Sequence, residues 1–551
     1  MSAHTENLQF SREDVDFGKA FQRTSSKFVK VSVVMDLSTP GFWKGAHDTD
    51  TDSRILPAEI PRELPEKLAE ELRRLEQLFT VDTAMLKKIT DKFGEELDEG
   101  LRKHASNVPM NITWVTSFPT GHEAGTYLTL DLGGTNLRVC LITLTGTPGG
   151  SEITQEKYQL PREIKTGTAD ELFDHIADRL GNFVTKHIKG DGAKQNDGKM
   201  PLGFTFSYPA TQERIDHGVL QTWTKGWDVK GVEGSDVGNM LRGAMEKRGL
   251  LVNLVTLIND TTGALIASAY NDPETIIGAI FGTGCNAAYM ERKSRIPKLH
   301  GTGPSSNGTT AISGTSREEK GDALMAINCE YGAFDNSHSI LPRTRYDEII
   351  DEQSPRPGEQ TFEKMSAGLY LGETFRQILV DLYARGVIFR DSKLDDKQKE
   401  LLNTAYAIDT EFLSNLENDA SPSLSSSLRA FESTVAGLQP TPAELIFLQS
   451  LAKLIAIRGA RLCACGVSAI CRRIGTQTGH VAADGSVAIK HPRFKERWEN
   501  AVREILDMKM GAKAAVDGGG ALEGIKLTSA EDGSGLGAAI ITALTLRRAE
   551  R

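Results

Sequence analysis

A helical repeat of apolar positions is the first regular pattern along the chain. Leu68, Leu72, Leu75 and Leu78 recur at spacings of four, three and three residues, so they are predicted to line one face of a helix. The run 82–103 continues in helical style, with charged residues at its polar positions. Two successive helices are therefore expected at the start of the folded part of the chain.

The first 59 residues are patterned much more weakly. Only FVKVSVVM, at 28–35, resembles a short strand, and the sequence after it is polar. Because this region offers little apolar surface for burial, we expect residues 1–59 to be an extension, disordered rather than a regulatory or dimer-contacting arm.

A strand, a glycine turn and a second strand occur twice further along the chain. YLTLDLGG precedes the apolar run NLRVCLITL, and IIGAIFGTG precedes CNAAYM. Glycine turns between apolar runs predict hairpins. A helix is expected at 169–187 and a strand at 202–207, and VTLINDTTGALIASAY predicts a strand, a polar turn and a helix of small residues. The repetition predicts two related αβ domains that face each other across a cleft.

Three stretches are dominated by small residues and are predicted to be insertions or linkers. They lie at 300–322, 414–427 and 510–524. The length of 551 residues predicts at least two cores.

Charge and cysteine usage limit the classes of partner. The net charge of -10 argues against a nucleic-acid surface, although backbone N–H groups can still hold an anionic nucleotide. No apolar stretch is expected to reach the roughly 18 residues that a membrane span needs, and the N-terminus lacks the features of a secretory signal. Six cysteines are too few for a disulfide framework, and Cys463, Cys465 and Cys471 are predicted to be plain buried residues. These features predict a cytoplasmic protein.

The first glycine turn has the composition of a phosphate-binding loop. In DLGGTNLRV, Gly133, Gly134 and Thr135 expose consecutive N–H groups without bulky side chains. Asp131, at the strand end, could hold Mg²⁺ through water. A simple hairpin turn is the alternative, and it would be preferred if this segment stood alone.

A second turn of the same kind favours the phosphate interpretation. Gly282, Thr283 and Gly284 in FGTGCNAAY would allow two loops to hold one polyphosphate from both sides. The chain has neither a P-loop motif nor a dinucleotide-binding glycine motif that opens a helix, so the predicted nucleotide site is of another kind.

Asp260 is the candidate general base. It follows Asn259 at the end of an apolar strand in LINDTTG, and functional side chains of open α/β sheets gather at such carboxyl ends. Asp260 could equally cap the helix that follows, and the segment by itself does not separate the two interpretations.

Several other segments place amide or carboxylate groups among glycines and aromatic residues. They include FTFSYPA, WTKGW, INCEYGAFDN and PGEQTFEKMSAG. Glu330, Glu363, Asn259 and Asn286 suit the paired hydroxyl groups of a sugar ring. Each of them could also be a turn residue or a surface acid when taken alone.

Together these segments closely resemble the hexokinase family, from about Ile60 to the C-terminus. LDLGGTNLRV, LGFTFSYPA, TWTKGW, LINDTTGALIASAYNDPET, IFGTGCNAAY, INCEYGAFD, LPRTRYD, RPGEQTFEKMSAGLYLGE, AADGSV and SAEDGSGLGAA stand in the family's order. FSYPATQE and KLHG look most like the fungal hexokinases and glucokinases. The resemblance implies an α/β fold of two domains, related to actin and Hsp70, with a sugar cleft between a small and a large domain.

The resemblance also implies domain boundaries. Residues 60–117 would form helices of the large domain, 118–258 the small domain, 259–532 the large domain, and 533–551 a helix that returns to the small domain. A hinge is expected around Asp260 and between Gly533 and Gly537.

Roles for individual residues follow from the same resemblance. Asp260 matches the base that takes the proton of the sugar 6-hydroxyl, and Lys225 matches a residue that reaches the sugar and the transferred phosphate. Arg138 belongs to the first phosphate segment, where a structural role is the alternative. The other matched sugar ligands are Ser207, Thr224, Asn259, Asn286, Glu330 and Glu363. The matched nucleotide contacts are Gly133, Gly134, Thr135, Asn136, Gly282, Thr283, Gly284, Gly466, Ser468 and Ser486.

The implied reaction is the transfer of phosphate from ATP, with Mg²⁺, to the 6-hydroxyl of glucose. A broad hexokinase that also uses fructose and mannose, an N-acetylglucosamine kinase and a non-catalytic sugar sensor are the alternatives on the same fold. An actin-like or Hsp70-like ATPase would not need the sugar ligands. A monomer or a weak homodimer is expected.

Overall fold

The computed structural model describes residues 64–188, 198–224, 226–300, 323–390, 394–435, 437–508, 524–530 and 532–549. The expected extension at 1–59 with its strand, the segments 301–322 and 510–523, and Lys225 lie outside these ranges.

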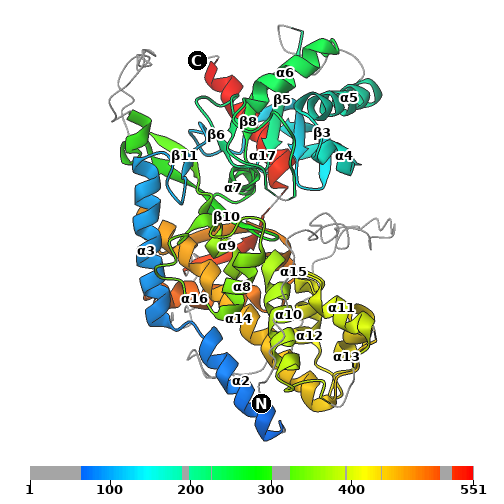
Figure 1. Ribbon diagram of the computed structural model, residues 1–551. Coiled ribbons are helices and arrows are strands. Elements are labelled where there is room, and N and C mark those ends of the chain that lie inside the picture. The colour runs from blue at the N-terminus through cyan, green and yellow to red at the C-terminus, as the bar shows by residue number, and fades with distance from the viewer. Residues whose placement is uncertain are drawn as a thin grey trace.

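A five-stranded sheet forms the upper part of the molecule in Figure 1. The central strands β2, β5 and β8 run parallel, whereas β3 and β4 pair antiparallel at one edge. The first expected hairpin is confirmed, because β2 and β3 pair antiparallel with Leu132 opposite Leu137. In sheet order the strands are β4 (Ser151–Gln159), β3 (Asn136–Thr145), β2 (Ala124–Leu132), β5 (Met200–Phe206) and β8 (Val252–Ile258).

Helices α5 (Ala169–His187) and α6 (Val237–Lys247) pack beside this sheet. The helix predicted at 169–187 is confirmed with the same bounds, and Thr168 and Glu171 form a capping box at its start. Its apolar face, which includes Leu172, Ile176 and Leu180, is fully buried. Short elements complete this part of the chain: α4 (Arg162–Lys165), β6 (Ala210–Thr211) and β7 (Val219–Leu220).

A six-stranded sheet lies in the other part of the molecule. β9 and β10 form the second expected hairpin, with Phe281 opposite Cys285, and β12 pairs parallel with β9. In sheet order the strands are β1 (Asn111–Ile112), β11 (Leu324–Asn328), β10 (Cys285–Arg292), β9 (Thr275–Phe281), β12 (Gly479–Asp484) and β13 (Ile525–Ser529).

Most of the helices surround this second sheet and extend below it in Figure 1. α2 and α3 confirm the two helices predicted at the start of the folded part. The helices are α2 (Glu66–Phe79), α3 (Thr83–Arg102), α8 (Arg345–Gln353), α9 (Thr361–Ser366), α10 (Gly368–Ala384), α11 (Asp396–Asn403), α12 (Thr410–Asn418), α13 (Ser425–Thr434), α14 (Pro442–Ile474), α15 (Ser486–Lys490) and α16 (Phe494–Ile505), with short 3₁₀ turns η1 (Lys293–Arg295), η2 (Pro297–His300) and η3 (Tyr331–Ala333).

Two sequence expectations about these helices are wrong. Leu68, Leu72 and Leu75 are buried, but Leu78 is 38% exposed. At about 100° per residue, Leu78 lies roughly 80° around the helix from Leu68 and falls at the edge of the buried stripe. The serine-rich stretch 414–427 was expected to be an insertion or a linker, and the linker alternative is wrong, because α12 and α13 occupy much of it.

The helix α14 is long and apolar enough to cross a membrane, which corrects the expectation that no stretch reaches that length. In the structure 94% of its apolar window is buried. α14 packs against α3, α16 and α12, so it is the central helix of this half of the molecule. Cys463, Cys465 and Cys471 lie on it, and their predicted burial is confirmed.

Two helices cross between the sheets. α7 (Asp260–Asn271) packs on β9 and β10, whereas α17 (Gly533–Ala549) packs on β2, β5 and β8. The helices meet at glycines: a Cβ on Gly263 would lie 2.3 Å from the carbonyl oxygen of Gly533, and one on Gly537 would lie 2.3 Å from that of Gly263. Only residues without a side chain permit so close a crossing.

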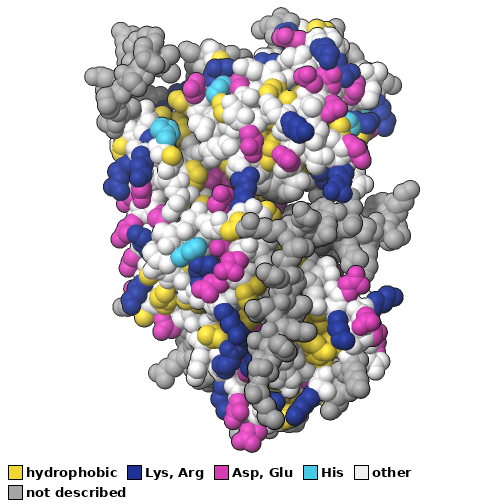
Figure 2. Space-filling view, viewed as in Figure 1, with side chains coloured by type: hydrophobic (Ala, Val, Ile, Leu, Met, Phe, Trp, Pro, Cys, Tyr) yellow, Lys and Arg dark blue, Asp and Glu magenta, His cyan; other side chains and the backbone are white. Residues whose placement is uncertain are grey.

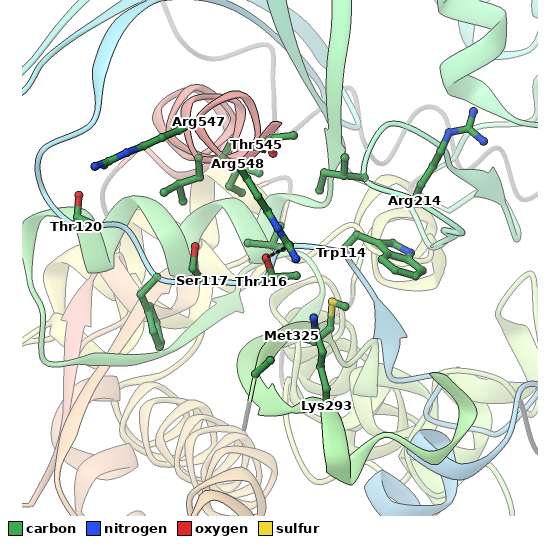
Figure 3. Close-up of a pocket in the computed structure, with 16 residues that line it drawn as sticks. Trp114, Thr116, Ser117, Thr120, Arg214, Lys293, Met325, Thr545, Arg547 and Arg548 are labelled. Carbon is green, nitrogen blue, oxygen red and sulfur yellow. Dashed lines mark hydrogen bonds between the residues drawn. The ribbon is translucent and has the colours of Figure 1, made fainter. Parts of the chain in front are cut away.

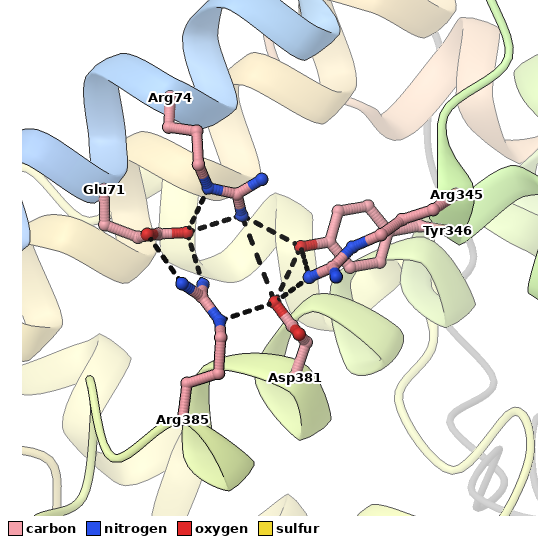
Figure 4. Close-up of polar contacts among 6 residues, drawn as sticks. All are labelled: Glu71, Arg74, Arg345, Tyr346, Asp381 and Arg385. Atoms are coloured by element: carbon pink, nitrogen blue, oxygen red, sulfur yellow. Dashed lines mark hydrogen bonds and ion pairs between the residues drawn. The ribbon is translucent and has the colours of Figure 1, made fainter.

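An ionic network fastens α2 to α8 and α10 (Figure 4). Arg385 bridges Glu71 at 2.5 Å and Asp381 at 3.1 Å. Arg74 donates to Glu71 and to the hydroxyl of Tyr346, which in turn donates to Asp381 at 2.9 Å. On the face seen in Figure 2, acidic and basic side chains are interspersed wherever described residues are visible.

Candidate functional site

The carboxyl ends of three parallel strands bring several candidate residues to one edge of the five-stranded sheet. β2 ends in the first glycine turn, β5 ends before Ser207, and β8 ends before Asn259 and Asp260. Because β2, β5 and β8 are parallel neighbours, these segments lie side by side. The backbone N–H of Ser207 donates to the carbonyl of Leu132 at 3.3 Å, which joins two of them directly.

The first glycine turn is held from outside by aromatic residues. The hydroxyl of Tyr208 donates to the carbonyl of Gly133 at 3.2 Å, and the indole N–H of Trp227 donates to that of Gly134 at 2.9 Å. These bonds fix the orientation of both peptide groups. The N–H of Gly133 is used within the turn, where it donates to the carbonyl of Asn136.

The second glycine turn has the same construction and lies in close contact with two further segments. The N–H of Gly282 donates to the carbonyl of Gly284 at 3.0 Å, and that of Gly368 donates to the carbonyl of Gly282 at 2.7 Å. Gly485 has φ of 110°, and a Cβ there would lie 2.5 Å from the carbonyl of Phe281. The turn is therefore packed tightly beside the start of α15, where Ser486 is the first residue.

Asp260 is the first residue of α7, and its carboxylate has a fixed orientation. Its Oδ1 accepts the N–H of Thr261 at 2.8 Å and the Thr261 hydroxyl at 3.2 Å. Asn259, and not Asp260, is the helix N-cap, because its Oδ1 accepts the N–H of Thr261 at 2.9 Å. Both side chains accept the same N–H of Thr261, so a catalytic role of Asp260 stays a prediction.

A cluster of amides and a carboxylate lies beside Asp260, built from the ends of β10 and β11. Nδ2 of Asn286 donates to Oγ1 of Thr261 at 3.1 Å, to Oδ1 of Asn328 at 2.8 Å and to Oε1 of Glu330 at 3.2 Å. Nδ2 of Asn328 donates to the same oxygen of Glu330 at 2.8 Å. Thr261 therefore connects the candidate base to two predicted sugar ligands, Asn286 and Glu330.

Glu330 adopts a backbone conformation that few residues other than glycine tolerate. Its φ is 53°, and its N–H donates to Oδ1 of Asn286 at 2.9 Å. Such strain persists only where surrounding contacts impose it, and it is common at functional sites.

Glu363 reaches the same region from α9. Its Oε2 accepts the N–H of Cys285 at 3.0 Å, and a Cβ on Gly284 would lie 2.4 Å from that oxygen. The second glycine turn and a predicted sugar ligand therefore touch each other.

A charged cluster links the first glycine segment to the C-terminal part of the chain. Arg138 donates to both carboxylate oxygens of Asp532 at 2.8 and 2.6 Å, to Ser534 at 2.8 Å, and to Asp131 at 3.3 Å. Burial raises the pKa of Asp131, the nearby Arg138 opposes that rise, and the charges of Asp260 and Asp532 add to it. Asp131 and Asp260 therefore lie near enough to interact.

Sequence reasoning missed Asp532 and Ser534 as individual residues, and also Asn328. The signal for the first two was the motif SAEDGSGLGAA, which was matched only as a whole. Asn328 stands two positions before Glu330, on the strand that pairs with Asn286's own strand.

Some predicted residues are not brought to these loops. Ser468 is fully buried in α14, and Gly466 of the same helix faces the ring of Tyr331, where a Cβ would lie 3.0 Å from Cε1. Their burial contradicts a direct contact with a nucleotide, and we place both in the core. Thr224 lies in the described part of the WTKGW loop, and its carbonyl accepts the N–H of Trp227 at 3.2 Å.

The described residues hold no group of three or more His, Cys, Asp and Glu side chains that would bind a metal ion. The side chain of Asp131, the predicted contact of Mg²⁺ through water, is 19% exposed, and that role stays a prediction.

A cavity of about 710 Å³ lies away from these loops, between the segment that follows β1 and the end of α17 (Figure 3). Thr116, Met325, Lys293 and Arg548 are among its lining residues, and Arg548 donates to Thr116 at 2.7 Å. Its lining includes none of the candidate site residues that the structure describes.

Comparisons with known proteins agree with one another. Two family models, each described as Hexokinase, match residues 71–270 and 276–544. The hexokinase of Emericella nidulans is 50% identical over 482 residues, which are 87% of this chain and 91% of that protein. The hexokinase of Kluyveromyces lactis is 47% identical, over 87% of this chain and 93% of that protein.

A solved hexokinase from Schistosoma mansoni, complexed with glucose, has a similar structure. The TM-score is 0.73 at 32% sequence identity, and the match covers 87% of this chain and 99% of that chain. The predicted two-domain, actin-like α/β fold is confirmed by this similarity together with the two sheets. The exact domain boundaries stay predictions.

Proposed function

Because the chain belongs to the hexokinase family, we propose that it transfers the γ-phosphoryl group of ATP to the 6-hydroxyl of glucose, giving glucose 6-phosphate and ADP. The observation that carries the proposal is the continuous set of hydrogen bonds from Asp260 through Thr261 to Asn286 and Glu330. Through these bonds, the carboxylate that we propose as the base is connected to two residues that we propose to bind sugar hydroxyls.

Sugar binding is assigned to the amides and carboxylates around this network. Asn286 and Asn328 both donate to Glu330, so the carboxylate is held in one orientation before the sugar arrives. Preorganised acceptors lower the entropic cost of ordering the ring hydroxyls. Ser207, Thr224, Asn259 and Glu363 complete the proposed set of ligands.

Asp260 is proposed to accept the proton of the 6-hydroxyl as that oxygen attacks phosphorus. The two hydrogen bonds from Thr261 to Oδ1 hold the carboxylate in one orientation, which supports this role. General-base catalysis of this kind contributes about 10²- to 10⁴-fold. Lys225 is proposed to act on the transferred phosphate from the WTKGW loop.

The two glycine turns are proposed to hold the phosphates. Since the N–H groups of Gly133 and Gly282 are used inside the turns, the phosphate contacts are assigned to the groups that follow: Gly134 to Asn136, and Thr283 to Gly284. Ser486 would contribute from the start of α15.

Asp131 would hold magnesium through water at the first turn. The ion, when bound with ATP, neutralises charge on the transferred phosphate. Arg138 is engaged with Asp131, Asp532 and Ser534, and we assign to it the role of holding these groups together.

Exclusion of water is the remaining requirement, because water also carries a hydroxyl group. Arg356, in the segment before α9, donates to the carbonyl of Trp223 at 3.2 Å, so the two halves of the molecule touch beside Thr224. We propose that closure on the sugar, about the crossing of α7 and α17, assembles the site. The ATPase rate without sugar should accordingly be very low.

The breadth of sugar use stays open between a glucokinase and a hexokinase that accepts fructose and mannose. N-acetylglucosamine is the third possibility, and we favour glucose on the segments FSYPATQE and KLHG. We further propose a cytoplasmic enzyme that is a monomer or a weak homodimer.

A coupled ADP-release assay tests the function. MgATP is supplied with glucose, fructose, mannose, N-acetylglucosamine or no sugar. We expect release with glucose and almost none without sugar, and the ratio of fructose to glucose rates measures the breadth. Binding of glucose without turnover on any sugar would contradict the kinase and support the sensor.

A further inference from the structure

Phe93 of α3 contacts both segments that carry the proposed sugar carboxylates. Its ring stacks on Phe334 with centroids 3.6 Å apart and meets Tyr331 and Phe362 edge-on at 5.6 and 5.0 Å. Tyr331 and Phe362 also meet each other edge-on at 5.7 Å. All four rings are fully buried, so this aromatic cluster (Phe93, Tyr331, Phe334 and Phe362) is a rigid unit.

The carboxylates are covalent neighbours of this cluster. Glu330 immediately precedes Tyr331, and Glu363 immediately follows Phe362. The two segments also lie close together, because a Cβ on Gly332 would lie 3.2 Å from Cβ of Glu363. We therefore expect a change in the packing of these rings to reach the backbone that carries the two carboxylates.

Contacts on the far side of the cluster keep it in place. Gly466 of α14 leaves room for Tyr331, since a Cβ there would lie 3.0 Å from that ring and 3.4 Å from Phe93. The loop after Phe334 is pinned by Asp335, whose carboxylate accepts the N–H groups of Ser339 at 2.7 Å and Leu341 at 2.8 Å. The absence of a side chain at Gly466 is thus explained by ring packing.

We propose that Phe93 is a positioning residue for sugar binding, which sets the distance between the carboxylates of Glu330 and Glu363. It acts from α3, more than two hundred positions before Glu330 in the sequence. It touches neither sugar nor phosphate and acts only through the rings beside the two carboxylates. The assignment of the carboxylates to sugar rests on the proposed function.

The test compares Phe93→Leu with Phe431→Leu. Phe431 is also fully buried and meets Phe412 edge-on at 4.9 Å, but in α13, outside the aromatic cluster. Both variants lose a ring and keep an apolar side chain, so a general loss of core packing affects them alike. The glucose KM, the ATP KM, kcat and the thermal midpoint are measured for each full-length variant.

We expect Phe93→Leu to raise the glucose KM about tenfold, the equivalent of losing one hydrogen bond to a charged group, with the ATP KM unchanged. Phe431→Leu should lower the thermal midpoint and leave both KM values equal to those of the wild-type protein. Equal glucose KM values for the two variants would overturn the positioning role. If the wild-type protein is inactive on every sugar, that result would instead refute the proposed function.

Gly466→Ala provides a second test if Phe93→Leu does not fold. The added methyl group favours helix formation and pushes on Tyr331 without removing any ring. A raised glucose KM with an unchanged ATP KM supports the proposal, and an unchanged glucose KM contradicts it.

Discussion

Gly263→Ala should disturb the crossing of α7 and α17 in a way that can be calculated from the structure. The new Cβ would lie 2.3 Å from the carbonyl oxygen of Gly533 and 3.1 Å from its carbon, so α17 must retreat by about 1 Å to reach ordinary contact. Overpacking of this kind costs about 1–3 kcal/mol, and the helix propensity of alanine returns about 1 kcal/mol. We expect a net loss of about 1 kcal/mol, within a range of about 0–2 kcal/mol, in the free energy of unfolding, measured in urea.

The same retreat should reach the active site. Ser534 follows Gly533 directly and accepts a hydrogen bond from Arg138, so displacement of α17 moves the charged cluster around Asp131. Because a misplacement of about 1 Å can cost about a hundredfold in rate, we expect kcat to fall by up to that factor.

Gly243→Ala is the matched control for this prediction. Gly243 lies within α6, and a Cβ there meets nothing within 4 Å. The substitution should stabilise the chain by about 0.5–1 kcal/mol and leave kcat unchanged. If Gly263→Ala were as stable and as active as Gly243→Ala, the tight crossing would play no part in stability or closure.

Three further outcomes can be measured directly. Asp260→Asn should lower kcat by about 10²- to 10⁴-fold with little change in the glucose KM, and near-normal turnover would exclude Asp260 as the base. Asp532→Asn should weaken the ion pair with Arg138, which should lower the free energy of unfolding by about 1–3 kcal/mol and raise the ATP KM. An unchanged urea midpoint would contradict the role given to this pair. Burial raises the pKa of Glu96 to about 7 from 4.5, so the folded chain keeps a proton that the unfolded chain releases. The free energy of unfolding should therefore fall as pH rises from 4.5 to 7. Across that range the thermal midpoint of Glu96→Gln should rise relative to that of the wild-type protein. A difference in thermal midpoint between the two that does not vary with pH would exclude the buried carboxyl as its cause.

Local sequence predicted the hairpins and the first helices well, since their determinants are local. The turn at Gly133 and Gly134 lies between two apolar runs, and the pairing of β2 with β3 follows from that turn alone. Thr168 and Glu171 form the capping box that starts α5 within four residues of sequence.

Small residues were the main source of error, because their pattern does not say what they face. Gly466 and Ser468 were expected at a nucleotide, but a distant ring and a packed core lie against them. The serine-rich stretch was expected to be an insertion or a linker. It is not a linker, because Asp419 accepts N–H groups from Ser421 at 3.1 Å and Ser427 at 2.7 Å, which orders the turn between two helices.

Residues far apart in sequence could be joined only by the fold. Asn328 was missed although Glu330 was found, because its partnership with Asn286 depends on the register of β10 against β11. Asp532 was missed for the same reason, since nothing local connects it to Arg138.

The pairing of Arg138 with Asp532 has a consequence for the synthesis of the protein. These residues are 394 positions apart, so at about 5–20 residues per second a ribosome needs roughly 20–80 s between adding one and adding the other. During that interval α17 does not exist, and the sheet surface that it covers on β2, β5 and β8 has no partner. The nascent chain therefore carries an exposed apolar surface of the kind that molecular chaperones recognise, and it can gain activity only after α17 has been synthesised.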